Sequence, residues 1–230
     1  MIGFFNYTMM LTYMSLASAG LGIIITLTFG NPYAGMMFLL FSGLCDAFDG
    51  KVARTKKNRS ETERKYGIQI DSLADIVAFG VLPVCIGASM LDNSQLNILD
   101  KGEILGKIFT IIIYVVMVAY IVTALMRLAY FNVTEEERQK SEAGIRKYYL
   151  GLPVTSAAII FPTFMVVQYL LDGIVDMDFT PIYFVVMSLC AVAFVTKFQL
   201  KKPQFKTLCL FVAIGVVEVV IMVIASLVLK

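Results

Sequence analysis

Residues 33–54, YAGMMFLLFSGLCDAFDGKVAR, begin as an apolar run and end as a charged segment. A helix of about 20 mostly apolar residues crosses the roughly 30 Å hydrocarbon core of a bilayer, so this run is long enough to form a transmembrane helix. Its C-terminal half contains Asp46, Asp49, Lys51 and Arg54. Ionisable groups are costly inside a span and usually mark function. The stretch therefore predicts a membrane helix with a polar site at one end.

The rest of the chain repeats the apolar part of this pattern. Further candidate spans lie at about 8–29, 68–91, 105–131, 151–171, 180–197 and 206–229. Of the 230 residues 59% are hydrophobic and 16% are charged, whereas about 25% charged residues are typical of soluble domains. We predict an all-α, polytopic membrane helical bundle of about seven transmembrane helices. Six or eight crossings stay open, because the segment at 180–197 is short.

This bundle is expected to be a single domain over residues 1–230, with additional C-terminal spans at about 180–229. Most of its 19 lysine and arginine residues fall in or beside the breaks at 55–67, 132–150 and 198–205, which seven spans place on one side. The positive-inside rule assigns that side to the cytoplasm. We therefore expect a multi-pass protein of the cell's inner (cytoplasmic) membrane, with its polar site facing the cytoplasm.

Composition also restricts the chemistry. The chain contains no histidine, so imidazole metal ligands, histidine bases and Ser-His-Asp triads are excluded. The high hydrophobic fraction and the low charged fraction argue against a basic nucleic-acid binder, so no nucleic-acid partner is expected. Any catalysis must use carboxylates, amines, guanidinium groups or hydroxyls.

Four aspartates are spaced to share two helix faces. Asp46 and Asp49 are three residues apart, and Asp71 and Asp75 are four apart, so each pair lies on one face of a helix. Carboxylates brought together cannot all stay ionised without a compensating charge, and oxygen clusters of this kind bind hard cations such as Mg²⁺. The alternative is a set of ion pairs with nearby lysine and arginine side chains at a wet helix end.

Small residues and an arginine accompany these aspartates. Gly50, Ala53 and Gly67 would let a phosphorylated ligand approach the backbone, and Arg54 can bind phosphate through two parallel hydrogen bonds. We therefore interpret the segment 46–75 as a combined metal and phosphate site.

The complete pattern is Asp46-x2-Asp49-Gly50-x2-Ala53-Arg54, a spacer, and Gly67-x3-Asp71-x3-Asp75. It resembles the motif of the CDP-alcohol phosphotransferase family at every position. The segments 68–83, 127–133 and 149–155 resemble the phosphatidylserine synthase branch of that family. The spacer, residues 55–66, is longer than is usual in the family.

The resemblance implies transfer of a phosphatidyl group from CDP-diacylglycerol to L-serine, with release of CMP. It implies a divalent metal, Mg²⁺ or Mn²⁺, on Asp46, Asp49, Asp71 and Asp75, with Asp75 also acting as the catalytic base. The expected CDP-diacylglycerol ligands are Gly50, Ala53, Arg54, Ser60, Gly67 and Ser72. The implied partners are membrane lipids and a second copy of the chain in a homodimer.

Recognition of serine or of phosphate is expected from a second set of polar residues, Arg127, Asn132, Arg146, Lys147 and Tyr149. The alternative for Arg127 is that its side chain only extends to the membrane interface.

Two other functions stay open. The first is the same chemistry with another alcohol acceptor, such as glycerol 3-phosphate or an inositol phosphate. The second, more remote, is a divalent-cation transporter, which would place carboxylates along a path through the bilayer. Labelled serine and glycerol 3-phosphate, offered with CDP-diacylglycerol, distinguish the three.

Overall fold

The computed structural model describes residues 3–94, 104–141, 148–172, 174, 177–201 and 205–228. The helices are α1 (Met10–Phe29), α2 (Pro32–Ala53), α3 (Glu61–Asp75), α4 (Leu82–Asn93), α5 (Ile104–Ser141), α6 (Ala157–Asp172), α7 (Thr180–Val195) and α8 (Phe205–Val228). The shorter elements are the 3₁₀ turns η1 (Tyr7–Met9) and η4 (Val154–Ser156), the π-helical segment η2 (Ile76–Val81), and the strands β1 (Tyr148–Leu150) and β2 (Gln199–Lys201). The predicted all-α, polytopic membrane architecture is confirmed.

Among the described residues, 4 helical segments are long and apolar enough to span a membrane: Tyr7–Phe29, Glu61–Asp92, Gly106–Arg138 and Val154–Asp172. Helix α2 has 22 residues, but the charges in its C-terminal half set it apart from these four. Helix α7 is shorter, with 16 residues. The total of seven crossings therefore stays a prediction.

Two helices extend beyond the limits expected from hydropathy. Helix α3 begins at Glu61, inside the predicted break at 55–67, because the Ser60 hydroxyl accepts a hydrogen bond from the Glu63 N–H at 3.1 Å and caps the first turn. Helix α5 continues to Ser141, well past residue 131, and Arg138 pairs with Glu135 at 2.7 Å in this extension. Capping and ion pairs stabilise helix in water, where hydropathy gives no signal.

Polar contacts between α1 and α2 hold these helices close together. The Ser15 hydroxyl donates to the Ser42 carbonyl at 3.3 Å, and the Ser42 hydroxyl donates to the Ser15 carbonyl at 3.0 Å. Small side chains allow such close approach between membrane helices. Gly35 of α2 is an example, because a Cβ atom there would clash with the Thr26 hydroxyl and lie 2.8 Å from Cγ1 of Ile86.

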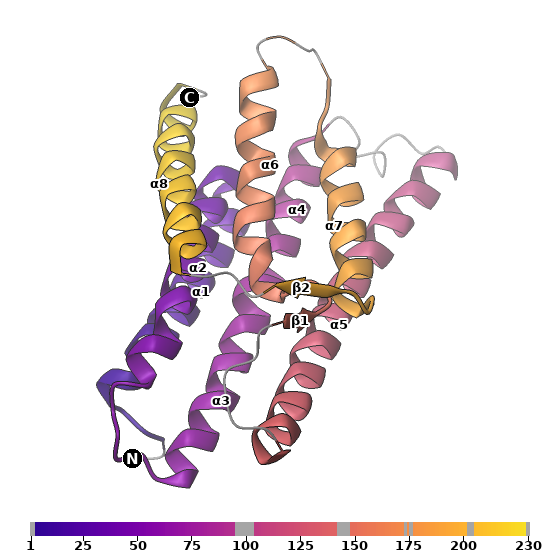
Figure 1. The fold of residues 1–230 in the computed structure, drawn as a ribbon. Helices are drawn as coiled ribbons and strands as arrows, with labels where there is room; N and C mark the ends of the chain where they lie inside the picture. The colour runs from indigo at the N-terminus through magenta and orange to yellow at the C-terminus, as the bar shows by residue number, and fades with distance from the viewer. Residues whose placement is uncertain are drawn as a thin grey trace.

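Figure 1 shows α8 alongside α2 and α6, and α7 alongside α5. The antiparallel strands β1 and β2 pair Tyr148 with Lys201, and they join the segment before α6 to the segment before α8. The start of α3 and the end of α5 project toward one end of the bundle, the end at which the N-terminus lies, while the C-terminus lies at the other end (Figure 1).

A pair of glycine substitutions tests the packing of α1, α2 and α4. Gly35→Ala should lower the melting temperature of the detergent-solubilised protein by several degrees, because an overpacked contact costs about 1–3 kcal/mol. Gly20→Ala is the matched control, since a Cβ atom at Gly20 meets nothing within 4 Å. Equal melting temperatures for the two variants would contradict the packing described here.

Candidate metal centre

Three of the four motif aspartates meet where the C-terminal half of α2 passes α3. One carboxylate oxygen from each of Asp46, Asp49 and Asp71 can be chosen so that all three lie within 4.8 Å of one another. Helical spacing turns Asp46 and Asp49 to the same side of α2, as predicted, and α3 brings Asp71 to that side. Side chains of the two helices thus form a three-carboxylate cluster.

The surroundings of the cluster make it electrostatically unfavourable without a cation. Asp49 is buried, with 7% of its surface exposed, and Asp46 and Asp71 are half-buried. Asp49 lies about one turn before the end of α2, where the helix dipole also disfavours negative charge. The donor set, three carboxylate oxygens from a rigid pair of helices, fits a hard divalent ion such as Mg²⁺ or Mn²⁺.

Asp75 lies beside this cluster rather than within it. It is also buried, with 7% of its surface exposed, and it lines the same cavity as the three clustered aspartates. The structure therefore brings all four predicted carboxylates to one cavity but groups only three of them at metal-binding distance. That separation suits different roles for Asp75 and the other three.

Thr12 of α1 completes the immediate surroundings of the cluster. Its hydroxyl donates to Oδ2 of Asp49 at 3.2 Å, and its side chain is buried. The bond fixes the orientation of the Asp49 carboxylate within the cluster. Thr12 was not among the residues predicted from the sequence, because a single threonine in an apolar run has no spacing that marks it.

Two of the predicted CDP-diacylglycerol ligands line the cavity. Gly50 and Arg54 follow Asp49 on α2 and at its C-terminal cap, and a Cβ atom at Gly50 would lie 3.7 Å from Nη1 of Arg54. The guanidinium group therefore folds back across Gly50, next to the carboxylates. A phosphate group at this point would find a positive charge and an unobstructed backbone.

The other four predicted CDP-diacylglycerol ligands are absent from the cavity lining. Ser60 caps α3, and the Ser72 hydroxyl accepts a hydrogen bond from Asn132 at 2.7 Å. Gly67 lies against Met9 and Arg59, because a Cβ atom there would lie 3.0 Å from Cε of Met9 and 2.8 Å from Nη2 of Arg59. Ala53 ends α2. Roles for these four in nucleotide binding stay predictions.

Arg127 reaches the same cavity from α5. It is buried, with 6% of its surface exposed, and its Nε donates to the Leu152 carbonyl at 3.2 Å. Its guanidinium carbon lies 5.6 Å from the centre of the Phe131 ring. The side chain is held inside the protein. The alternative explanation, in which it only extends to the membrane interface, does not fit this position. Asn132, by contrast, links α5 to α3 through Ser72 and lies outside the lining.

Three weaker candidates remain predictions. Arg146 and Lys147 lie outside the described residues. The backbone of Tyr149 belongs to β1, where it pairs with Leu200.

The cavity that joins these groups has a volume of about 1140 Å³. Its polar part contains Asp46, Asp49, Gly50, Lys51, Arg54, Asp71, Asp75 and Arg127. Most of its apolar part comes from three helices: Met37, Leu40, Phe41 and Leu44 of α2, Ile159 and Ile160 of α6, and Phe211, Val212, Val216, Val219 and Val220 of α8.

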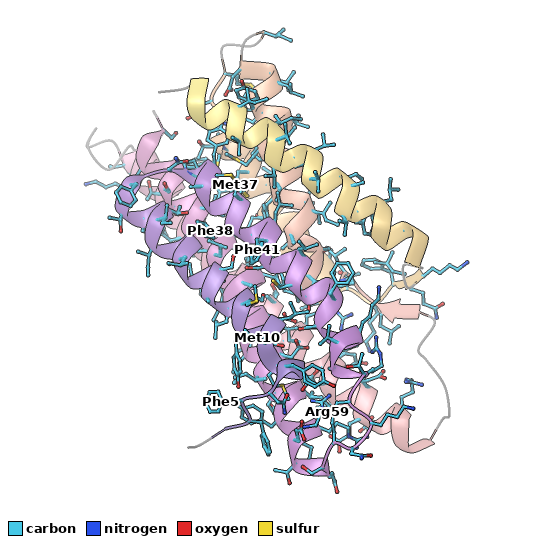
Figure 2. All side chains as sticks on the ribbon, turned by 90° about the vertical axis from the view of Figure 1, so that its left-hand side faces the viewer. Phe5, Met10, Met37, Phe38, Phe41 and Arg59 are labelled. Carbon is cyan, nitrogen blue, oxygen red and sulfur yellow. The ribbon has the colours of Figure 1, made fainter. Side chains whose placement is uncertain are left out.

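Helix α8 is the outer wall of the apolar part. It packs against α2 and α6, and Figure 2 shows Met37 and Phe41 on α2 beside it. Gly215 of α8 faces α2 in this region, because a Cβ atom there would lie 3.5 Å from Cδ2 of Leu40. A single cavity thus joins charged groups to a hydrocarbon surface, which is the shape of a site for an amphipathic molecule.

Most of the chain matches a known protein family. The family model for CDP-alcohol phosphatidyltransferases matches residues 5–194. This range includes every predicted site residue, whereas α8 follows it.

Curated relatives share part of this range. The chain is 33% identical over 126 residues to a CDP-diacylglycerol–serine O-phosphatidyltransferase of Saccharomyces cerevisiae, covering 54% of this chain and 38% of the relative. It is 30% identical over 129 residues to the enzyme of that name from Mycobacterium tuberculosis, covering 56% of this chain and 38% of the relative. It is 28% identical over 156 residues to an archaetidylserine synthase of Methanothermobacter thermautotrophicus, covering 67% of this chain and 55% of the relative.

The aligned region thus spans less than two thirds of each of these relatives. The match of the family model covers most of the chain, and the carboxylate cluster lies inside it. This chain belongs to the CDP-alcohol phosphatidyltransferase family.

Proposed function

We propose that this protein transfers the phosphatidyl group of CDP-diacylglycerol to L-serine, forming phosphatidylserine and releasing CMP. The observation that carries the proposal is the continuous cavity that places a carboxylate cluster at one end and a hydrocarbon wall at the other. A lipid with a charged diphosphate head needs both surfaces. The names of the relatives support serine as the acceptor.

Asp46, Asp49 and Asp71 would hold the divalent cation. When bound, Mg²⁺ or Mn²⁺ neutralises the negative charge of the diphosphate and makes its phosphorus easier to attack. By holding the cation, the three carboxylates would determine where the diphosphate binds in the cavity. Arg54, exposed at the cavity edge beside Gly50, would bind a phosphate oxygen of the same group.

Asp75 would act as the general base. The serine hydroxyl oxygen forms a bond to the phosphorus that carries diacylglycerol, and the bond from this phosphorus to the CMP oxygen breaks. CMP leaves with the electron pair, and the hydroxyl proton moves to the Asp75 carboxylate. A carboxylate is the appropriate base here because the chain has no histidine.

Arg127 would bind the carboxylate of serine. Its side chain lies in the cavity wall, and its hydrogen bond to the Leu152 carbonyl fixes the orientation of the guanidinium group. A buried guanidinium in a site of this size is suited to a small anionic acceptor. The same group would also attract glycerol 3-phosphate, so the acceptor must be tested directly.

The decisive assay uses the purified chain in detergent with CDP-diacylglycerol, Mn²⁺ and labelled L-serine. Labelled phosphatidylserine and stoichiometric CMP are expected. Product with glycerol 3-phosphate but not with serine would replace serine as the acceptor. Absence of any lipid product, together with Mn²⁺ uptake into sealed proteoliposomes that contain the chain, would favour a transporter.

Orientation and assembly belong to the same proposal. We expect the cluster to face the cytoplasm, where serine and CDP-containing lipid heads are accessible, and we expect the chain to form a homodimer. Labelling of single cysteines from each side of the membrane, and cross-linking of two differently tagged copies, test these expectations.

Asp75→Asn should separate binding from catalysis. Removing the base should lower turnover roughly 100-fold or more, while Mn²⁺ still binds at Asp46, Asp49 and Asp71. Asp71→Asn should instead weaken Mn²⁺ binding itself. Asp92→Asn is the control, since Asp92 is exposed at the far end of α4. Near-normal turnover of Asp75→Asn would exclude Asp75 as the base.

Arg127→Lys should raise KM for serine about tenfold, because a charge-assisted hydrogen bond contributes about 1.5–3 kcal/mol. KM for CDP-diacylglycerol should change little. The control is Arg138→Lys, on the same helix but outside the cavity, where Arg138 pairs with Glu135. Steady-state kinetics with each substrate varied in turn distinguish the two, and an unchanged KM for serine would refute the assignment.

Gly215→Phe should narrow the apolar part of the cavity between α2 and α8. Activity with dipalmitoyl substrate should fall about tenfold relative to dioctanoyl substrate. Each acyl-chain methylene group that can no longer be buried in the cavity costs about 0.8 kcal/mol of binding free energy. Val217→Phe is the matched control, since Val217 is exposed on the same helix. An equal chain-length preference in both variants would show that α8 does not contact the acyl chains.

A further inference from the structure

The helix that carries Asp71 and Asp75 changes its pitch immediately after Asp75. Residues Ile76–Val81 form the π-helical segment η2, and the Leu82 N–H bonds to the Val77 carbonyl, five residues back instead of four. A π-helical turn contains about one residue more than an α-helical turn. Because an α-helix advances 3.6 residues per turn, one extra residue rotates everything before it by roughly 100° relative to everything after it.

The part after the π segment is fixed in the bundle. Leu82 and Ile86 of α4 are fully buried, and the Tyr183 hydroxyl of α7 donates to the Pro83 carbonyl at 2.7 Å. With α4 held in this way, the π segment determines the direction in which the aspartates of α3 point. A regular α-helix through these residues would turn Asp71 and Asp75 away from Asp46 and Asp49 on α2.

One hydrogen bond from another helix supports the π segment. Proline has no N–H group, so Pro83 cannot donate to the carbonyl of Phe79 as the residue four positions later does in an α-helix. The Tyr120 hydroxyl of α5 donates to this carbonyl at 2.8 Å, and both residues are fully buried. A buried carbonyl left without a donor would be costly.

Tyr120 is held rigidly for this contact. Its ring packs edge-on against Phe161, with centroids 5.8 Å apart, and lies 5.4 Å from the ring of Phe194. Replacing it with phenylalanine should therefore remove the hydroxyl while the ring stays in place.

Phe79, whose carbonyl Tyr120 bonds, also lies close to α2, the helix that carries Asp46 and Asp49. A Cβ atom at Gly43 of α2 would lie 3.9 Å from Cε1 of Phe79. Gly43 is three residues before Asp46. Phe79 thus lies one turn after Asp75 on its own helix and contacts α2 one turn before Asp46.

We propose that Tyr120 is a positioning residue for the metal centre, and that its hydrogen bond to the Phe79 carbonyl keeps the π segment in the register that directs Asp71 and Asp75 toward α2. Tyr120 itself touches neither metal nor substrate. The proposal rests on the proposed function in one respect, that the cluster binds a divalent cation.

The test compares Tyr120→Phe with Tyr183→Phe. Each variant removes the hydroxyl of a fully buried tyrosine that donates to a backbone carbonyl. The acceptor of Tyr120 is the Phe79 carbonyl in η2, whereas the acceptor of Tyr183 is the Pro83 carbonyl in α4, one turn farther from the aspartates. Mn²⁺ binding to the purified proteins is measured by the loss of the electron paramagnetic resonance signal of free Mn²⁺. The thermal melting of each metal-free protein is recorded alongside.

Tyr120→Phe should weaken Mn²⁺ binding about three- to tenfold, the range expected for the loss of one hydrogen bond. Tyr183→Phe should bind Mn²⁺ like the wild type although its melting temperature also falls. Unchanged binding in Tyr120→Phe, or equal weakening in both variants, would overturn the positioning role. Absence of Mn²⁺ binding in the wild type would instead refute the metal centre of the proposed function, and with it this role.

Discussion

The rest of this structure depends on one constraint, the mutual repulsion of four buried or half-buried carboxylates. Asp46, Asp49 and Asp71 approach one another closely enough for a shared ligand, and Asp75 is buried beside them. Such a group is stable only with a compensating cation or with shared protons. Without such compensation the ionised aspartates would repel one another, so contacts made elsewhere must hold together the helices that carry them.

Those contacts are made by uncharged groups. Serine hydroxyls join α1 and α2 through reciprocal bonds to backbone carbonyls, and tyrosine hydroxyls of α5 and α7 bond to carbonyls in η2 and α4. Bonds of this kind add no net charge to a helix bundle that lies in lipid. These contacts are therefore neutral. The four motif aspartates, Lys51, Arg54 and Arg127 line the cavity, where a cation and a diphosphate can balance their charges.

Much of the site could be predicted from local spacing. The pairs Asp46/Asp49 and Asp71/Asp75 were expected on shared helix faces, and the structure has them so. The positions of Ser60, Gly67 and Ser72 could not be derived in this way. Each of them contacts a residue from another part of the chain or caps a helix, and no periodicity reports on such contacts. Thr12 was missed for the same reason.

The sequence by itself determined that this is an all-α membrane protein with a carboxylate site, because hydropathy and helical spacing are local properties of the chain. Only the tertiary structure decided which three aspartates lie within 4.8 Å of one another and that α8 lines the apolar part of the cavity. It also decided that a π-helical segment separates α3 from α4. These features depend on the angles at which helices pack. Such angles arise from contacts between residues far apart in sequence, such as Tyr120 with Phe79.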